Sequence, residues 1–328
     1  MFTRSKLLTA SSGYILLLVA FWFVAQGFRT ESLIEGHILS AYSAFALALA
    51  PYWFLGFGTT EALRGLLSNR VARALTAGLL ALPYIIFSVP RGEFHWIYAS
   101  VLLGIPVGMA ALFEFLPPGG ARPSPGKLCW QDVIALALVG LPVEFGWLRG
   151  AFPHPGLGAL SKLLLVDSAL YAFLVVRGLE GVGYDFRCRA RDFLVGVREF
   201  AFFAPIAIVL SLAVRFITPH ADTPPWSSVL AALPVTFFFI AIPEELFFRG
   251  LLQNLLEARL GHRGSLLLTS VIFGLSHFNK PVPFNLRYVL LATIAGVFYG
   301  RAWRDRRRVL SSATTHTLVD EIWWLWFR

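Results

Sequence analysis

Charged residues are scarce in this chain. Only 14% of its 328 residues are Asp, Glu, Lys or Arg, whereas soluble domains contain about 25%. Hydrophobic residues make up 57% of the chain, and the mean hydropathy is +0.67. This composition excludes an ordinary soluble domain and indicates a membrane protein before any motif is considered.

Cysteine is scarce as well. The two cysteines, Cys129 and Cys188, form no C-x-x-C spacing, so the sequence suggests neither a thiolate metal site nor a disulfide framework. The chain also lacks His-Glu-x-x-His, the motif in which one helix presents two zinc ligands together.

Long basic runs are rare, although the net charge is +9. The basic residues lie in short segments between apolar stretches, and they alternate in abundance: 177–198 and 301–308 are rich in arginine, whereas 219–226 has no Lys or Arg. Cytoplasmic loops of membrane proteins carry such an excess. We therefore expect no nucleic-acid partner, and we predict a multi-pass protein of the inner (cytoplasmic) membrane with a cytoplasmic N-terminus.

Apolar segments are abundant. Eleven of them approach the length that spans a bilayer, about 20 residues. They are residues 11–28, 36–57, 71–89, 95–116, 131–148, 158–176, 199–218, 227–247, 264–279, 286–303 and 309–327. The sequence predicts an all-α bundle with about 11 transmembrane spans (range 9–11).

The mixed-charge stretch 177–199 is the longest interruption between these segments. It predicts a division into a six-span region, 1–190, to which no motif assigns a role, and a five-span region, 191–328.

Two adjacent acids, Glu244 and Glu245, interrupt the apolar run that begins near Val229. An unpaired charge at membrane depth costs several kcal/mol or more, so these carboxylates need partners. Arg249 follows Glu245 by four residues, which places both on one face of a helix.

Two histidines fall inside the apolar segments, and both are in the same half as the acid pair. His277 follows Phe273 by four residues, and His316 precedes Asp320 by four. Three helices thus each offer a polar group backed by a neighbour one turn away. Such a set can hold a water molecule between carboxylate and imidazole, as general-base hydrolysis requires.

The motifs Glu-Glu-x-x-x-Arg, Phe-x-x-x-His and His-x-x-x-Asp, in this order on separate helices, resemble those of the CAAX protease and bacteriocin-processing family of glutamic-type intramembrane proteases. The stretches Glu244–Leu252 and Gly296–Gly300 are also similar to that family. The resemblance covers roughly 200–328.

The resemblance implies an intramembrane endopeptidase with six site residues. Glu244 would be the general base that activates water, and Glu245 would lie beside it, held by Arg249. His277 would position the water or stabilise the oxyanion, and His316 would line the same cavity. Asp320 stands where the family often has an asparagine; an ionised aspartate cannot donate to an oxyanion, so it could instead orient His316.

We expect no cofactor, with zinc as the alternative, in which case Glu244, His277 and His316 would be its ligands. The expected partners are membrane lipid and a protein or peptide substrate, either prenylated or carrying a C-terminal sorting signal. A proton-coupled transporter and a non-catalytic membrane scaffold are the alternative functions. A transporter would more naturally show inverted repeats.

Two features stay open at this level. Glu144 and Asp167 are acids inside predicted spans five and six; each could pair with an arginine of a neighbouring helix, or the N-terminal half could shape substrate access through them. The charge pattern also places Glu244 near the cytoplasmic end of its span and His277 near the external end of the next. The two can meet if the helix of Glu244 continues past Arg249, or if the segment after His277 turns back.

Overall fold

The structure is a computed structural model. It describes residues 4–27, 38–116, 127–154, 157–219 and 224–327, without the side chains of 4–6 and 24–27. Residue 28 of the first predicted segment, residues 36 and 37 of the second, and residues 220–223 of the loop without basic residues lie outside the described residues.

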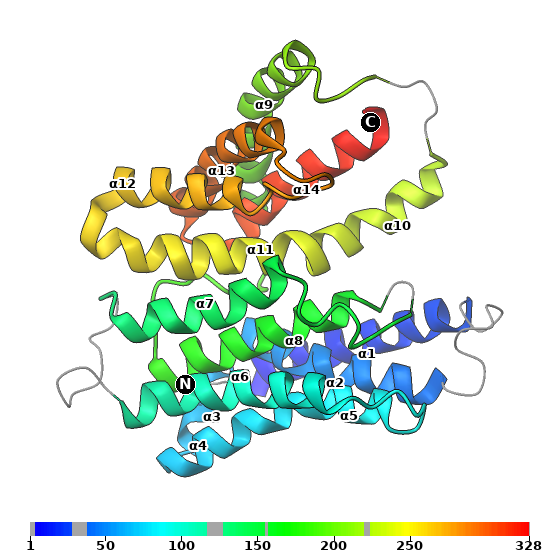
Figure 1. Cartoon of the computed structure of the whole chain (residues 1–328), viewed down its shortest axis with the longest axis vertical. Coiled ribbons are helices and arrows are strands. Elements are labelled where there is room, and N and C mark those ends of the chain that lie inside the picture. The colour runs from blue at the N-terminus through cyan, green and yellow to red at the C-terminus, as the bar shows by residue number, and fades with distance from the viewer. Residues whose placement is uncertain (1–3, 28–37, 117–126, 155–156, 220–223, 328) are drawn as a thin grey trace. The chain divides into compact units, whose positions relative to one another are not determined.

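All regular secondary structure in the described part of the chain is helical (Figure 1). Each of the eleven predicted segments contains a helix, which confirms the all-α class. Among the residues that the structure describes, six helical stretches are long and apolar enough to cross a membrane. They are Ile38–Gly56, Arg70–Ser88, Trp96–Phe115, Ala159–Arg177, Ala190–Ala213 and Trp226–Leu275. The total number of spans therefore stays a prediction.

The chain folds as two compact units. Unit 1 comprises Met1–Pro125 and Cys129–Glu180, and unit 2 comprises Gly126–Leu128 and Gly181–Arg328. Separate roles for the predicted regions 1–190 and 191–328 stay a prediction.

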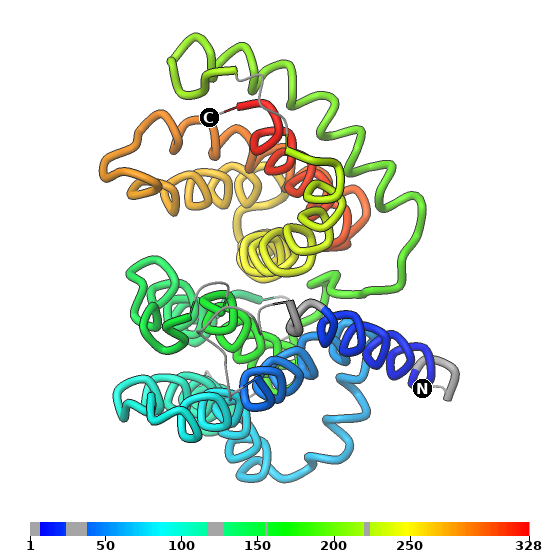
Figure 2. The backbone as a smooth tube through the Cα atoms, turned by 90° about the vertical axis from the view of Figure 1, so that its right-hand side faces the viewer, coloured from blue at the N-terminus to red at the C-terminus, as the bar shows by residue number. Residues whose placement is uncertain are grey.

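Unit 1 contains the following helices: α1 (Arg4–Gly27), α2 (Ile38–Gly56), α3 (Thr60–Leu66), α4 (Arg70–Ala77), the 3₁₀ segment η2 (Gly78–Ala81), α5 (Leu82–Ser88), α6 (Trp96–Phe115), α7 (Trp130–Glu144), α8 (Ala159–Leu170) and the π-helical η4 (Tyr171–Arg177). Figure 2 shows α1 at the edge of this unit, where it packs on α2. Prolines interrupt α2, α6 and α7, as buried membrane helices tolerate.

Two buried ion pairs tie the helices of unit 1 together. Arg73 Nε lies 2.5 Å from Glu114 Oε1 and links α4 to α6, and Arg177 Nε lies 2.5 Å from Asp132 Oδ1 and links η4 to α7. Each arginine reaches both carboxylate oxygens, the two-pronged geometry that suits a desolvated pair.

Unit 2 contains the following elements: α9 (Ala190–Ala213), α10 (Trp226–Thr236), the π-helical η5 (Phe237–Ala241), α11 (Ile242–Glu245), the π-helical η6 (Leu246–Gln253), α12 (Asn254–Leu275), α13 (Leu286–Arg306) and α14 (Val309–Trp326). The helices α9, α13 and α14 pack on one another, and α12 packs on α13.

Elements α10, η5, α11, η6 and the first part of α12 form one long rod in Figure 1, and the rest of α12 runs back beside it. The helix continues from Trp226 until Gly261, whose φ of 64° breaks it and reverses the chain. A helix over 226–260 is roughly 50 Å long at about 1.5 Å per residue, which exceeds the hydrocarbon core of about 30 Å. Glu244 lies near its middle. The continuation of this helix past Arg249, one of the two arrangements left open by the sequence, is therefore confirmed.

Small residues let the helices of unit 2 approach closely. A Cβ on Gly196 of α9 would stand 2.4 Å from Thr314 Cβ on α14, and a Cβ on Gly296 of α13 would stand 3.0 Å from Ser270 Cα on α12. Membrane helices commonly use small residues in this way. These contacts bring the elements that carry the predicted site residues together.

Candidate active site

Glu245 is the centre of the polar cluster in unit 2. Its side chain is fully buried, and its Oε1 accepts from Arg249 Nη1 at 3.0 Å. The same oxygen lies 2.9 Å from His316 Nδ1 on α14. The acid thus joins a cation on its own helix to an imidazole on another, which satisfies the requirement that a buried charge has partners.

Arg249 is also fully buried. Its Nη2 donates to the Gly296 carbonyl at 3.1 Å, and its guanidinium carbon lies 4.5 Å from the Phe273 ring centroid and 5.2 Å from that of Tyr299. One carboxylate, one carbonyl and three aromatic rings, those of Phe248, Phe273 and Tyr299, therefore surround the charge, an arrangement that suits a planar guanidinium. This fixes the position of Glu245.

His316 lies between carboxylates. Its Nε2 is 3.5 Å from Asp320 Oδ2 and 3.9 Å from Glu244 Oε2, while its Nδ1 meets Glu245. The Tyr299 ring stacks on the imidazole with centroids 4.7 Å apart and 17° between the planes. With acceptors at both nitrogens and an aromatic ring against one face, the imidazole has a fixed orientation.

His277 follows the end of α12 and is mostly buried. Its Nδ1 lies 2.9 Å from the Phe273 carbonyl, so the ring donates from Nδ1 and presents Nε2 elsewhere. The Tyr288 ring lies 4.5 Å away, centroid to centroid. The Phe273 ring lies between the two histidines, 4.9 Å from the His277 ring and 5.9 Å from the His316 ring.

The two adjacent glutamates have different surroundings. Glu245 has no exposed side-chain surface, whereas Glu244 keeps 30% and Asp320 keeps 35%. Glu244 and Glu245 lie on the single α-helical turn α11, between the π-helical segments η5 and η6. Pro243 lies in this turn and lacks the N–H of an α-helical hydrogen bond. Such π-helical insertions are frequent at functional sites, where they change the face that a residue occupies.

A cavity of about 70 Å³ adjoins the histidines. Its polar lining includes His277, His316, Asp320 and the tyrosines Tyr288 and Tyr299. The volume accommodates water molecules. Glu244 does not line this cavity, but its Oε2 lies 3.9 Å from Nε2 of His316, which does.

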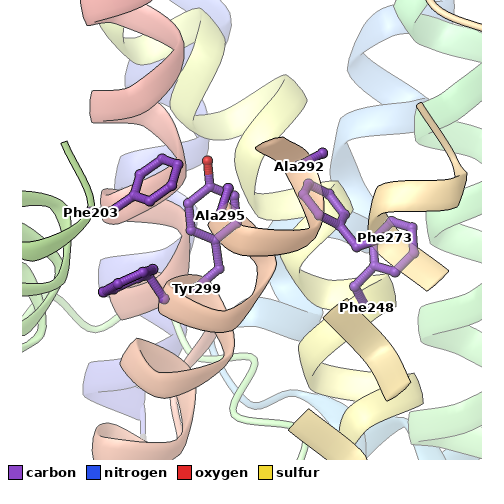
Figure 3. Close-up of a cluster of buried hydrophobic side chains, with 7 residues drawn as sticks. Phe203, Phe248, Phe273, Ala292, Ala295 and Tyr299 are labelled. Atoms are coloured by element: carbon purple, nitrogen blue, oxygen red, sulfur yellow. The ribbon is translucent and has the colours of Figure 1, made fainter. Parts of the chain in front are cut away.

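Aromatic residues form the apolar side of this cavity. Figure 3 shows Phe248 and Phe273 close together beside α13, and Phe203 of α9 on the other side of Tyr299. The Phe248 and Phe273 ring centroids are 5.0 Å apart. Phe203 and Phe273 of this cluster line the cavity directly.

All six predicted residues therefore belong to one cluster within unit 2. Direct polar contacts join Glu244, Glu245, Arg249, His316 and Asp320, and His277 shares the cavity with His316 and Asp320. Their catalytic roles stay predictions.

Sequence reasoning gave no role to several residues of the cluster. Tyr299 lies within the recognised stretch Gly296–Gly300 but was not assigned to the site. Gln253 repeats the contact of Arg249 one turn later: its Nε2 donates to the Gly300 carbonyl at 3.4 Å. The four-residue spacing of Arg249 and Gln253 matches that of Gly296 and Gly300, and this shared period was the available signal.

A further polar contact lies next to the cluster. Thr236 Oγ1 donates to Glu321 Oε1 at 2.7 Å, and both residues are buried. Glu321 directly follows Asp320, and its Thr236 partner lies on α10, which no local pattern in the sequence indicates.

No group of three or more His, Cys, Asp or Glu side chains in the described ranges is arranged to hold a metal ion. The choice between a metal-free site and the zinc alternative stays a prediction.

The fold and the site define the class of this protein: an integral membrane protein of helices with a carboxylate–imidazole cluster buried in one unit. Residues 225–322 match the family of type II CAAX prenyl endopeptidases, Rce1-like. The segment that carries the cluster is thus similar to the CAAX protease family, which confirms the predicted resemblance. The comparisons with curated proteins and with solved structures gave no match.

Proposed function

We propose that this protein is an intramembrane endopeptidase that hydrolyses a peptide bond of a membrane-associated protein or peptide, with Glu244 as the general base. The single observation that carries the proposal is the position of His316. Its Nδ1 meets the buried Glu245–Arg249 pair, and its Nε2 faces the partly exposed Glu244 and Asp320.

This geometry separates the roles of the two glutamates. Glu245 is enclosed by Arg249 and His316 and has no exposed surface for a water molecule or a substrate. Glu244 retains exposed surface beside the imidazole. A general base must come within hydrogen-bond reach of the proton that it abstracts. Glu244 meets this requirement and Glu245 serves as the group that positions His316.

In the proposed reaction, Glu244 takes a proton from water while the water oxygen bonds to the carbonyl carbon of the scissile peptide. His316, with carboxylates beside both nitrogens, donates its Nε2–H to the developing oxyanion. The proton on Glu244 then passes to the amide nitrogen as the C–N bond breaks, which yields a carboxylic acid and an amine and restores the glutamate. Asp320 orients the His316 ring rather than donating to the oxyanion.

His277 has a different role. Because its Nδ1–H donates to the Phe273 carbonyl, the neutral ring presents an acceptor at Nε2. We assign to it the positioning of the attacking water through that lone pair.

The matched family suggests the substrate to test first. Its description names a CAAX prenyl endopeptidase, so a prenylated C-terminal peptide is the first substrate class, and a C-terminal sorting signal is the second. The cavity of about 70 Å³ is too small for a peptide, so binding requires α9, α13 or α14 to move apart.

The deciding experiment uses the purified full-length chain in lipid nanodiscs with a prenylated and an unprenylated reporter peptide. We expect cleavage by the wild type and a loss of about 10²- to 10⁴-fold with Glu244→Gln. Glu61→Gln, an acid-to-amide change on α3 of unit 1, is the matched control. Cleavage that survives Glu244→Gln would remove the general-base assignment.

The same preparation separates the remaining alternatives. Ion flux in proteoliposomes without cleavage of any reporter peptide would favour a transporter, and neither activity would favour a scaffold. For the metal question, activity that disappears with a chelator and returns with zinc would overturn the metal-free proposal. We expect activity to persist in the chelator.

A further inference from the structure

Unit 1 contains a large cavity that the proposed peptidase mechanism does not use. Its volume is about 630 Å³, within the range of about 300–1,000 Å³ typical of small-molecule sites. The walls come from α1, α2, α3, α4, η2, α5, α8 and η4, and they are formed mainly by leucines with Phe54 and the prolines Pro51 and Pro83.

Asp167 is the one charged side chain among the described lining residues. It lies on α8 and is fully buried. Neither of its carboxylate oxygens has a partner with hydrogen-bond geometry in the described part of the chain. The backbone N–H of Tyr52 is the protein donor near this carboxyl group. The sequence-based expectation that an arginine of a neighbouring helix pairs with Asp167 is therefore wrong for the described residues.

The other buried acids of unit 1 show how unusual this is. Glu114 and Asp132 each receive two hydrogen bonds from an arginine. The nearby hydroxyl of Tyr171, which also lines the cavity, donates instead to the Arg73 carbonyl. Asp167 thus faces a mainly apolar space, and no side chain of the described residues donates a hydrogen bond to it. Acids at membrane depth are costly and mark functional sites when they have no protein partner.

Glu144, the other acid left open by the sequence, differs from Asp167. It is the last residue of α7 and is partly exposed. Asp167 is therefore the acid of unit 1 whose surroundings indicate a bound ligand.

We propose that this cavity binds a lipophilic amine, with its hydrocarbon chain against the leucines and its ammonium group on the Asp167 carboxylate. An ammonium donates N–H bonds and cancels the charge at the same time, and such charge-assisted hydrogen bonds are about twice as strong as neutral ones. A neutral alcohol can supply only the hydrogen bond. The cavity therefore favours ligands that have both a hydrocarbon chain and a positive charge.

Two of the leucines that line this cavity also have exposed surface. Leu66 and Leu79 line it and are 82% and 58% exposed. In a membrane protein, exposed leucines on helices such as these face hydrocarbon. A lipophilic amine that partitions into the bilayer would enter between α3 and η2, without crossing water.

Photolabelling of the full-length protein in nanodiscs tests this proposal. The probe is a dodecylamine with a diazirine in its chain, and labelled peptides are identified by mass spectrometry. We expect saturable labelling on α2, α3 and α5, and an apparent affinity reduced roughly 10- to 100-fold by Asp167→Asn. The matched dodecanol probe should label weakly in the wild type, and Glu61→Gln should label like the wild type.

A second variant keeps the test decisive if Asp167→Asn fails to fold. Ala50→Phe places a ring in the cavity and leaves the carboxylate intact, and it should reduce labelling at the same sites. Equal labelling by the amine and the alcohol, or labelling unchanged in both variants, would overturn the proposal and show that the cavity holds bulk lipid. Because the readout is labelling of unit 1, it is independent of peptidase activity.

Discussion

In unit 1, the cations beside the buried carboxylates Glu114 and Asp132 are arginines, whereas in unit 2 the buried carboxylate of Glu245 is shared between an arginine and a histidine. The first arrangement is closed: each charge is neutralised and each pair joins two helices. The second is open, because the imidazole that contacts Glu245 also lies beside Glu244 and Asp320, which are partly exposed.

This difference distinguishes buried charges that stabilise the fold from buried charges that are placed for a chemical reaction. An ion pair that satisfies itself has no capacity left for a substrate, and its removal affects the fold. The carboxylate–imidazole cluster keeps Nε2 of His316 and the oxygens of Glu244 available beside a cavity. Asp167 in unit 1 is a third case, a buried acid whose partner is not supplied by the described protein residues.

The largest effect that we expect in a test of this comparison is a loss of catalysis. Glu244→Gln should reduce kcat by about 10²- to 10⁴-fold and leave the thermal unfolding temperature close to that of the wild type, because Glu244 is partly exposed. Peptide cleavage and differential scanning fluorimetry on the same preparation measure both. A large loss of stability instead would mean that Glu244 is structural.

The next effect concerns the enclosed ion pairs. Arg249→Met in unit 2 and Arg73→Met in unit 1 each remove the buried guanidinium that contacts a buried carboxylate, so each should destabilise its unit by about 3–5 kcal/mol. Urea unfolding followed by tryptophan fluorescence measures this.

Double replacements separate the two pairs. Replacing both Arg73 and Glu114 by leucine should recover most of the stability of unit 1, because apolar substitutes for a buried pair are often neutral. Replacing both Arg249 and Glu245 by leucine should leave the peptidase inactive even where the protein folds. Activity in this second variant would show that Glu245 does not position His316.

A smaller effect distinguishes the packing of the two units. Gly196→Ala places a Cβ 2.4 Å from Thr314 Cβ, whereas a Cβ on Gly104 of α6 meets nothing within 4 Å. We expect Gly196→Ala to destabilise unit 2 by about 1–3 kcal/mol and Gly104→Ala to be neutral or slightly stabilising. Thermal unfolding of both variants provides the comparison, and an equal response would contradict the close approach of α9 and α14.

The smallest effect is a pH dependence at the segment that leads into α9. Burial by itself would raise the pKa of Asp185, but hydrogen bonds from Arg187 and Arg308 outweigh it and lower this pKa to about 2. Because the folded pKa lies below the ordinary value of about 3.9, the stabilisation is present above about pH 4 and is lost as the pH falls toward 2.

Unfolding of the wild type and Asp185→Asn between pH 7 and pH 3 tests this. The stability difference should be constant above about pH 5 and shrink below about pH 4. Arg187→Gln should move this loss to higher pH, because it removes one of the groups that lower the pKa. A difference that does not change with pH would exclude the ion pair as its source.

Local spacing predicted a large part of the site. The four-residue separations of Glu245 from Arg249 and of His316 from Asp320 place each pair on one helix face, and the structure joins both. The division of labour between Glu244 and Glu245 could not be predicted, because adjacent residues on a helix differ in surroundings only through neighbouring helices. The π-helical segments on either side of them also leave no clear sequence pattern.

The sequence by itself determined the helical membrane class, the segments that form helices and the family of the segment 225–322, since these depend on composition and local order. The tertiary structure decided which nitrogen of His316 meets which acid, that the Gly296 carbonyl faces Arg249, and that no arginine among the described residues pairs with Asp167. Contacts between helices fix these features. Over the 71 residues that separate Glu245 from His316, only packing can specify that two side chains meet.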